Sequence, residues 1–167
     1  MTSSTTEPIS PSRYVTGHDE NGRAVFSFEG QIPTTSFDDK GRKAIFAVPW
    51  QTTTFPAECS GPDAVTLGGP LNNESGTVCR IVEFPPNMSS PPHRTVSLDY
   101  GIMVSGELEL ELDDGHVRSI VPGDVCVQRG TMHTWHNRTD KWARMVFVLV
   151  ASKPIEVDGK PLEYVMH

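Results

Sequence analysis

Apolar and polar residues alternate strictly between Gly106 and Gly115, where the sequence reads Gly-Glu-Leu-Glu-Leu-Glu-Leu-Asp-Asp-Gly. Such alternation indicates an extended strand, because successive side chains of a strand point to opposite faces. The closing Asp-Gly pair is a favoured two-residue turn between antiparallel strands. This stretch is therefore predicted to begin a β-hairpin, with its leucines facing a core and its glutamates facing water.

Short strands are also predicted along most of the remaining chain. Glycine and proline number fourteen each, and the longest stretch without either, residues 131–153, is divided by a turn-like Asn-Arg-Thr-Asp cluster. We therefore expect strands rather than a long helix, with a helix at 142–150 as the alternative. The expected strands are 24–28, 44–48, 78–84, 117–121, 125–128, 132–137 and 142–150. Short strands at this spacing indicate a sandwich or barrel.

One domain is expected, since 167 residues suffice for a buried core without disulfide bonds. Residues 1–12 are rich in Ser, Thr and Pro, so we expect a disordered tail there and a single domain over 13–167. The part from 13 to 77 is too polar to fold alone and is expected to add strands to the sheets. Residues 155–165 are predicted to form a short hairpin around Asp158-Gly159.

Composition narrows the choice of partners. A formal net charge of -7 argues against nucleic acid or an anionic membrane surface, since both attract basic proteins. No apolar run approaches the roughly 18 residues of a spanning helix, and no secretory signal is visible. Three cysteines without a Cys-x-x-Cys pair fit reduced thiols. We expect a cytoplasmic protein with a small-molecule substrate, and a homodimer in which the N-terminal part covers an edge of the second subunit.

Two segments place chemically useful side chains on common faces. Residues of equal parity in an extended segment share a face, which groups His93, Thr95, Ser97 and Asp99. The same argument groups His133, Trp135 and Asn137, whereas His136 should point away. A pocket lined by both faces would offer imidazoles, a carboxylate, hydroxyls and an indole, a mixture suited to an oxygenated aromatic or keto acid.

These segments resemble the two motifs of the cupin family, G-x5-H-x-H-x3,4-E-x6-G and G-x5-P-x-G-x2-H-x3-N. In the first, Pro92-His-Arg-Thr-Val-Ser-Leu-Asp99 leads to Gly106 at the family's interval; in the second, Gly123-Asp-Val leads to His133, with Asn137 four residues beyond. The resemblance covers residues 78–150. It implies an all-β cupin double-stranded β-helix, a jelly-roll barrel, here with additional N-terminal strands.

The resemblance also implies a ligand set. Cupin metalloenzymes use two histidines and a glutamate from the first motif and one histidine from the second. Here His93 and His133 match, Thr95 replaces the second histidine and Asp99 replaces the glutamate. The implied metal ligands are His93, Asp99 and His133, holding one divalent ion (Zn, Mn, Fe or Ni). A metal-free site is the alternative.

Further roles follow for the residues around these ligands. Thr95, Ser97 and Trp135 are expected to contact the substrate. Arg94 and Arg129 flank the motifs and could bind a substrate carboxylate bidentately, with surface ion pairs as the alternative. Asn137 is expected to be structural and to fix the turn before Trp142.

Three functions compete. We expect an enzyme, first a lyase or isomerase, such as a decarboxylase or dehydratase acting on a β-keto or polyketide-like acid. In this reaction His93 and His133 hold a metal or polarise a carbonyl, and Asp99, its pKa raised by burial, moves a proton. Similar compact cupins look like tailoring proteins of secondary-metabolite pathways. The alternatives are a metal-dependent dioxygenase and a non-catalytic binder of a small ligand.

Overall fold

The computed structural model describes residues 8, 10–39, 41–67 and 74–166. Within these ranges the chain is almost entirely β-structure, with one short 3-10 helix at Ala64–Leu67. The prediction of an all-β fold is therefore confirmed. No helix in the described ranges is long and apolar enough to cross a bilayer.

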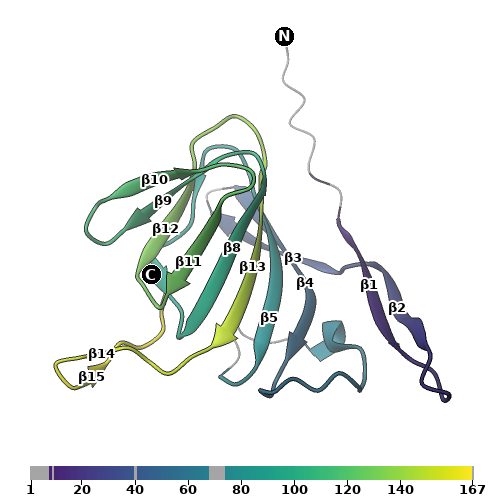
Figure 1. Ribbon diagram of the computed structural model, residues 1–167. Coiled ribbons are helices and arrows are strands. Elements are labelled where there is room, and N and C mark those ends of the chain that lie inside the picture. Colours follow the sequence, from purple (N-terminus) through teal and green to yellow (C-terminus); the bar gives the residue numbers. More distant parts are fainter. Residues whose placement is uncertain (1–7, 9, 40, 68–73, 167) are drawn as a thin grey trace, which may run out of the picture.

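Two six-stranded antiparallel sheets form the barrel (Figure 1). One of them, here the β8 sheet, has the order β11 (Val125–Arg129), β8 (Ser97–Ser105), β13 (Ala143–Ala151), β5 (Thr77–Phe84), β4 (Arg42–Thr52) and β3 (Thr34–Asp39). The other, here the β12 sheet, has the order β10 (Val117–Ile120), β9 (Leu108–Leu112), β12 (His133–Asn137), β7 (His93–Arg94) and β16 (Val165–Met166), and β6 (Met88–Ser89) also pairs with β12.

The predicted strands are present, with shifted ends. The predicted strand at 44–48 is the middle of the longer β4, and the one at 142–150 begins one residue later as β13. The C-terminal hairpin around Asp158-Gly159 forms as β14 (Glu156–Val157) and β15 (Lys160–Pro161). The chain then continues into β16, which pairs with β7 and so becomes part of the barrel.

The hydrophobic core lies between the two sheets. On β9, Leu108 and Leu110 are buried, as the alternation predicted, and on β13 Met145, Phe147 and Leu149 are buried at every second position. The glutamates of β9 lie on the outer face. There the Arg138 guanidinium donates to the carboxylate of Glu109 at 2.6 Å, and Glu111 pairs with His136 at 2.8 Å.

The N-terminal part divides between the barrel and a projecting hairpin. β3 and β4 extend the β8 sheet, as expected for the part from 13 to 77. β1 (Ser12–His18) and β2 (Ala24–Gln31) pair with each other and project from the barrel (Figure 1). Of the predicted tail, residues 1–7 and 9 lie outside the described residues. Ser10 lies within them and donates a hydrogen bond to the Ile32 carbonyl.

The segment His93 to Asp99 does not form one continuous strand. β7 ends at Arg94 in the β12 sheet, and β8 begins at Ser97 in the β8 sheet. The chain therefore crosses from one sheet to the other at residues 95–96. This crossing brings polar side chains of both sheets together at one end of the barrel.

Asn137 fixes the turn between β12 and β13, as the sequence predicted. Its buried side-chain amide donates to the carbonyls of Phe84 and Lys141, at 3.0 and 2.8 Å. Its oxygen accepts hydrogen bonds from the backbone N–H and the hydroxyl of Thr139. These four contacts tie the turn to β5 and to itself, as expected of a structural residue.

Candidate functional site

A cavity of about 450 Å³ lies between the two sheets. Most of its wall is apolar, and its aromatic side chains are Phe37, Phe46, Phe84, Trp135 and Phe147. Its polar residues include His93, Thr95, Asp99, Gln128 and His133. An apolar cavity with a few polar groups is the usual form of a small-molecule site.

His93 and His133 face each other across the ladder between β7 and β12. They are directly paired in the register, and their ring centroids are 4.2 Å apart. The Nδ1 atom of His93 lies 2.9 Å from the Pro91 carbonyl oxygen, and that of His133 lies 2.9 Å from the Thr131 carbonyl oxygen. A carbonyl oxygen only accepts hydrogen bonds, so each Nδ1 carries the proton and donates. In each neutral ring Nε2 is therefore the nitrogen with a free lone pair.

Burial keeps both rings neutral at pH 7. Burial, with a smaller contribution from the charge of His93, lowers the pKa of His133 to about 4, although its contact with Thr131 acts in the opposite direction. Burial also lowers the pKa of His93, although its contact with Pro91 and the charge of Asp99 act in the opposite direction. The cavity therefore contains two unprotonated Nε2 atoms, which can bind a metal ion or accept a proton.

Asp99 is a buried carboxylate held by two hydroxyl groups. Thr95 Oγ1 donates to one of its oxygens at 3.1 Å, and Ser97 Oγ donates to the other at 2.5 Å. Burial raises the pKa of Asp99, whereas these two hydrogen bonds and the charge of His93 lower it to a smaller extent. The result is an oriented carboxyl group whose pKa lies above its ordinary value, as a proton-transfer group requires.

The other predicted contact residues fall into two groups. Thr95 and Trp135 line the cavity, and Trp135 packs edge-on against Phe147 with ring centroids 5.7 Å apart. Ser97 is not among the lining residues and acts on the site through Asp99. Arg94 and Arg129 are also absent from the lining: Arg94 pairs with β16, and Arg129 is exposed at the end of β11.

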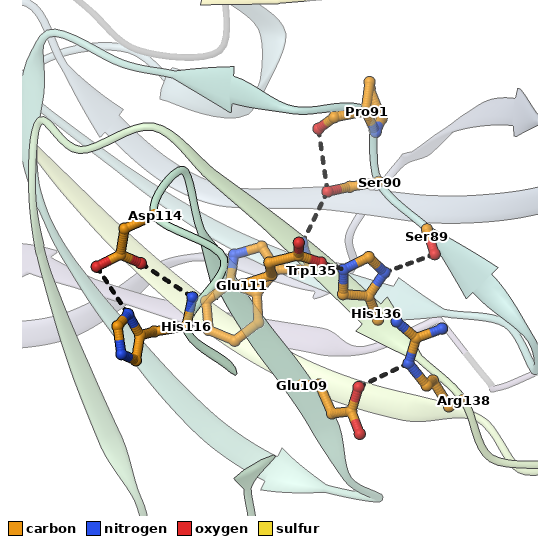
Figure 2. A network of polar contacts seen from close by, with 10 residues as sticks. All are labelled: Ser89, Ser90, Pro91, Glu109, Glu111, Asp114, His116, Trp135, His136 and Arg138. Atoms are coloured by element: carbon orange, nitrogen blue, oxygen red, sulfur yellow. Dashed lines mark hydrogen bonds and ion pairs between the residues drawn. The ribbon is translucent and has the colours of Figure 1, made fainter. Parts of the chain in front are cut away.

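His136 points away from the cavity, as its parity predicted. Its ring lies between Ser89 and Glu111 on the outer side of the β12 sheet (Figure 2). Ser89 Oγ lies 2.7 Å from Nδ1, and Glu111 Oε2 lies 2.8 Å from Nε2. These contacts join β6, β12 and β9, so His136 ties strands together.

The histidine pair fits a metal ion better than the full three-residue set does. Among the described residues, no group of three or more His, Cys, Asp or Glu side chains is arranged to hold a metal ion. Both oxygens of Asp99 accept hydrogen bonds from Thr95 and Ser97. His93 and His133, with their donating Nδ1 atoms fixed by carbonyl oxygens, are oriented as metal-binding histidines usually are.

Many cavity residues escaped the sequence analysis, and three of them bear on the chemistry of the site. Arg80 lies on the inner face of β5, stacks over Phe46 and lines the cavity. The alternation of β5 could have revealed it, because Val78 and Val82 flank it on the same face. Gln128 lines the cavity from β11, and the β11–β8 register places it opposite Asp99. Phe46 reaches the site from β4, and no local signal linked that strand to the motifs.

The β-barrel with a histidine-lined cavity defines the class, and comparison with known proteins identifies the family. A cupin domain model matches residues 80–149. Phomopsin biosynthesis cluster protein C' of Diaporthe leptostromiformis is 41% identical over 91% of this chain and 84% of its own. The cupin-domain-containing oxidoreductase virC of Hypocrea virens is 38% identical over 87% of this chain and 78% of its own. The chain therefore belongs to the cupin family.

A solved structure supports the same fold. The polyketide cyclase RemF from Streptomyces resistomycificus superposes with a TM-score of 0.51 at 20% sequence identity. The match covers 74% of this chain and 77% of that one. At this identity the likeness concerns the fold, and it confirms the predicted cupin jelly-roll barrel.

Proposed function

We propose that this protein is an enzyme of secondary metabolism, a lyase or isomerase that acts on a β-keto or polyketide-like acid in the barrel cavity. The observation that carries the proposal is Asp99, a buried, hydrogen-bonded carboxyl group with a raised pKa, placed in a mainly apolar cavity beside neutral imidazoles. The names of the relatives, which refer to a biosynthesis cluster, support the metabolic context.

The residues of the cavity divide the work of such a reaction. The apolar walls hold the carbon skeleton and exclude water, which strengthens the electrostatic interactions inside. Asp99 takes a proton from the carbon next to a carbonyl group, and Thr95 and Ser97 hold its oxygens in place. His93 and His133 have no N–H to offer the cavity at neutral pH, so they act as lone-pair donors rather than as polarisers of a carbonyl.

The lone pairs of His93 and His133 would hold a divalent metal ion. When bound, such an ion supplies Lewis-acid stabilisation of negative charge on a substrate oxygen. The Pro91 and Thr131 carbonyls fix the two rings for this role.

The reaction class can be tested with a panel of aryl β-keto acids and aryl ketones. The protein is incubated with each compound in D2O, and ¹H NMR follows loss of carbon dioxide, loss of water and deuterium uptake at the carbon next to the carbonyl. Turnover that depends on Asp99 supports the proposal. Binding of the compounds without any of these three changes would contradict it and favour a non-catalytic binding protein.

An oxidoreductase is the second candidate, because several relatives are named cupin-domain-containing oxidoreductases. Such a protein, for example a dioxygenase, needs a redox-active metal ion. The two candidates therefore differ in metal identity and in oxygen consumption.

Metal content is predicted to depend on both cavity histidines. Elemental analysis of the purified protein should find about one divalent ion per chain, and His93→Ala or His133→Ala should each remove most of it, because a single remaining imidazole binds weakly. His18→Ala is the matched control, since His18 is exposed on β1. Iron together with substrate-dependent oxygen uptake would favour the oxidoreductase, and an unchanged metal content in both cavity variants would disprove histidine ligation.

We also propose that the protein is a homodimer. On the outer face of the β8 sheet, Tyr100, Ile102 and Val104 are exposed beside Val125 and Val127, which are more than half exposed. The β1–β2 hairpin carries a second apolar surface, where Tyr14 and Phe26 pack edge-on with centroids 6.2 Å apart and are each about two thirds exposed. A second copy of the chain can cover both surfaces through one twofold axis.

Charge on the outer face is predicted to separate the dimer. The double variant Tyr100→Lys with Val127→Lys places two cations in the apolar patch, and it should convert a dimer to a monomer in light scattering coupled to size-exclusion chromatography. Val117→Lys, on β10 of the other sheet, should leave the mass unchanged. A dimeric mass for the double variant would show that this face is not the interface.

We propose a cytoplasmic location for the protein. Its three cysteines, Cys59, Cys79 and Cys126, are all free thiols. Free thiols fit a reducing compartment.

A further inference from the structure

Gln128 is one of the polar residues that line the cavity. Within β11, Val125 and Val127 point outward, whereas Gln128 points inward and is only 4% exposed. It lines the cavity, and the register between β11 and β8 places it directly opposite Asp99. The amide is therefore a close neighbour of the proposed proton-transfer group.

The Nε2 atom of Gln128 is buried and has no hydrogen-bond partner among the described residues. An amide nitrogen carries two N–H groups, and leaving such a donor unpaired away from water is costly, so buried donors in proteins are nearly always paired. The other two buried amides show the usual situation. Gln51 Nε2 donates to the Ala64 carbonyl, and Asn137 donates to two carbonyls.

Arg80 and Trp135 also bring N–H groups to the cavity, but the strand register places neither of them opposite Asp99, as it does Gln128. The cavity nitrogens of His93 and His133 are acceptors, and the hydroxyls of Thr95 and Ser97 donate to Asp99. A carbonyl oxygen next to the reacting carbon gains negative charge during proton removal, and it needs a hydrogen-bond donor. The side-chain amide of Gln128 provides such a donor beside Asp99.

We propose that Gln128 is a catalytic residue whose amide donates a hydrogen bond to the substrate carbonyl oxygen and to the enolate oxygen that replaces it. As Asp99 takes the proton, the electrons of the C–H bond form a C=C bond, and the carbonyl electrons move to the oxygen that Gln128 holds. This inference rests on the proposed function. It narrows the substrates to compounds with a carbonyl group next to the carbon that loses its proton to Asp99.

The ionised form of 4-nitrophenol, a stable analogue of an enolate, provides a test that needs no turnover. Binding is measured by absorbance titration in Asp99→Asn protein, because an uncharged amide imitates the carboxyl group after it has taken the proton. Adding Gln128→Leu should weaken phenolate binding at least about tenfold, since a hydrogen bond to a charged oxygen is lost. Adding Gln128→Glu, which keeps the size and removes both donors, should do the same.

Gln31→Leu in the same background is the matched control, since Gln31 is exposed on β2 outside the cavity, and it should change phenolate affinity less than twofold. The midpoint of thermal unfolding adds a second readout. Without ligand, Gln128→Leu should unfold at the same temperature as its parent or at a higher one, because it removes an unpaired buried donor. A lower midpoint with unchanged phenolate affinity would mean that Gln128 is structural, and absence of phenolate binding by the parent would also overturn the inference.

The two proposals can fail separately. If no keto acid reacts but phenolate binding still requires Gln128, the reaction class is wrong and the role of Gln128 as an oxygen-binding donor stands. If keto acids react equally well in the wild type and in Gln128→Leu, the reaction class stands and the role of Gln128 is wrong.

Discussion

Asp99→Asn is expected to lower kcat by about 10²–10⁴-fold, the range that general acid–base catalysis contributes. The amide has nearly the shape of the carboxylate, but it cannot take a proton from the substrate. One of the two hydroxyls that bind Asp99 can still donate to the amide oxygen and the other can accept from the amide nitrogen, so the fold should remain intact. The measurement is kcat for the best substrate of the keto acid panel, with circular dichroism to confirm folding.

The exposed Asp114 provides the control for this substitution. Asp114→Asn changes the same functional group outside the cavity and should leave kcat unchanged. Ser97→Ala adds a test of mechanism: it removes a hydrogen bond that lowers the pKa of Asp99, so the acid limb of the pH–kcat profile should move to higher pH. Asp99→Asn protein that turns over at the wild-type rate would show that Asp99 is not the proton-transfer group.

Acidification of the metal-free protein is expected to reduce its free energy of unfolding through His133. The pKa of this histidine is about 4 in the folded protein, against an ordinary value of 6.5. Above pH 6.5 the ring is neutral in both states, so its contribution is fully present. Between pH 6.5 and 4 only the unfolded chain takes up the proton, and stability is lost. The pKa difference corresponds to about 3 kcal/mol.

Urea unfolding of chelator-treated protein at pH 7.5 and pH 4.5 measures this loss. Asp99 has the opposite effect, because its raised pKa favours the folded state as the carboxyl group becomes protonated. The loss of the free energy of unfolding is therefore compared between wild type and His133→Gln, because both proteins contain Asp99. His133→Gln should lose less stability on acidification than wild type does, and His18→Gln should lose the same amount. Equal losses in wild type and His133→Gln would show that His133 is protonated as readily in the folded state as in the unfolded chain.

The local pattern of the chain was enough to predict most strands. Alternation placed Leu108 and Leu110 in the core and predicted β9 and its turn, because the direction of a side chain in a strand depends only on parity. The same rule, with the motif spacing, brought His93 and His133 into one site and sent His136 to the outer face. These features depend on neighbouring residues and on the geometry of an extended chain.

The composition of the cavity depends on contacts between distant segments. The cavity is lined by Arg80, Phe46 and Gln128 because their strands, β5, β4 and β11, all belong to the β8 sheet. The order of strands in a sheet cannot be read from any one segment of the sequence. The single extended strand expected for 93–99 is instead divided between two sheets. That division follows from barrel closure, which requires the chain to cross from one sheet to the other.

The sequence by itself determined that this protein is a cupin-like β-barrel, and it pointed to His93, Asp99 and His133 as the candidate site residues, because strand parity and motif spacing are local properties. Only the tertiary structure decided what these residues can do. Burial between the two sheets raises the pKa of Asp99 and keeps the imidazoles neutral. Backbone carbonyls accept the Nδ1 hydrogen of each ring, which leaves Nε2 as the nitrogen with a free lone pair. Charge state and hydrogen-bond direction depend on the surrounding atoms, which come from strands far apart in the chain.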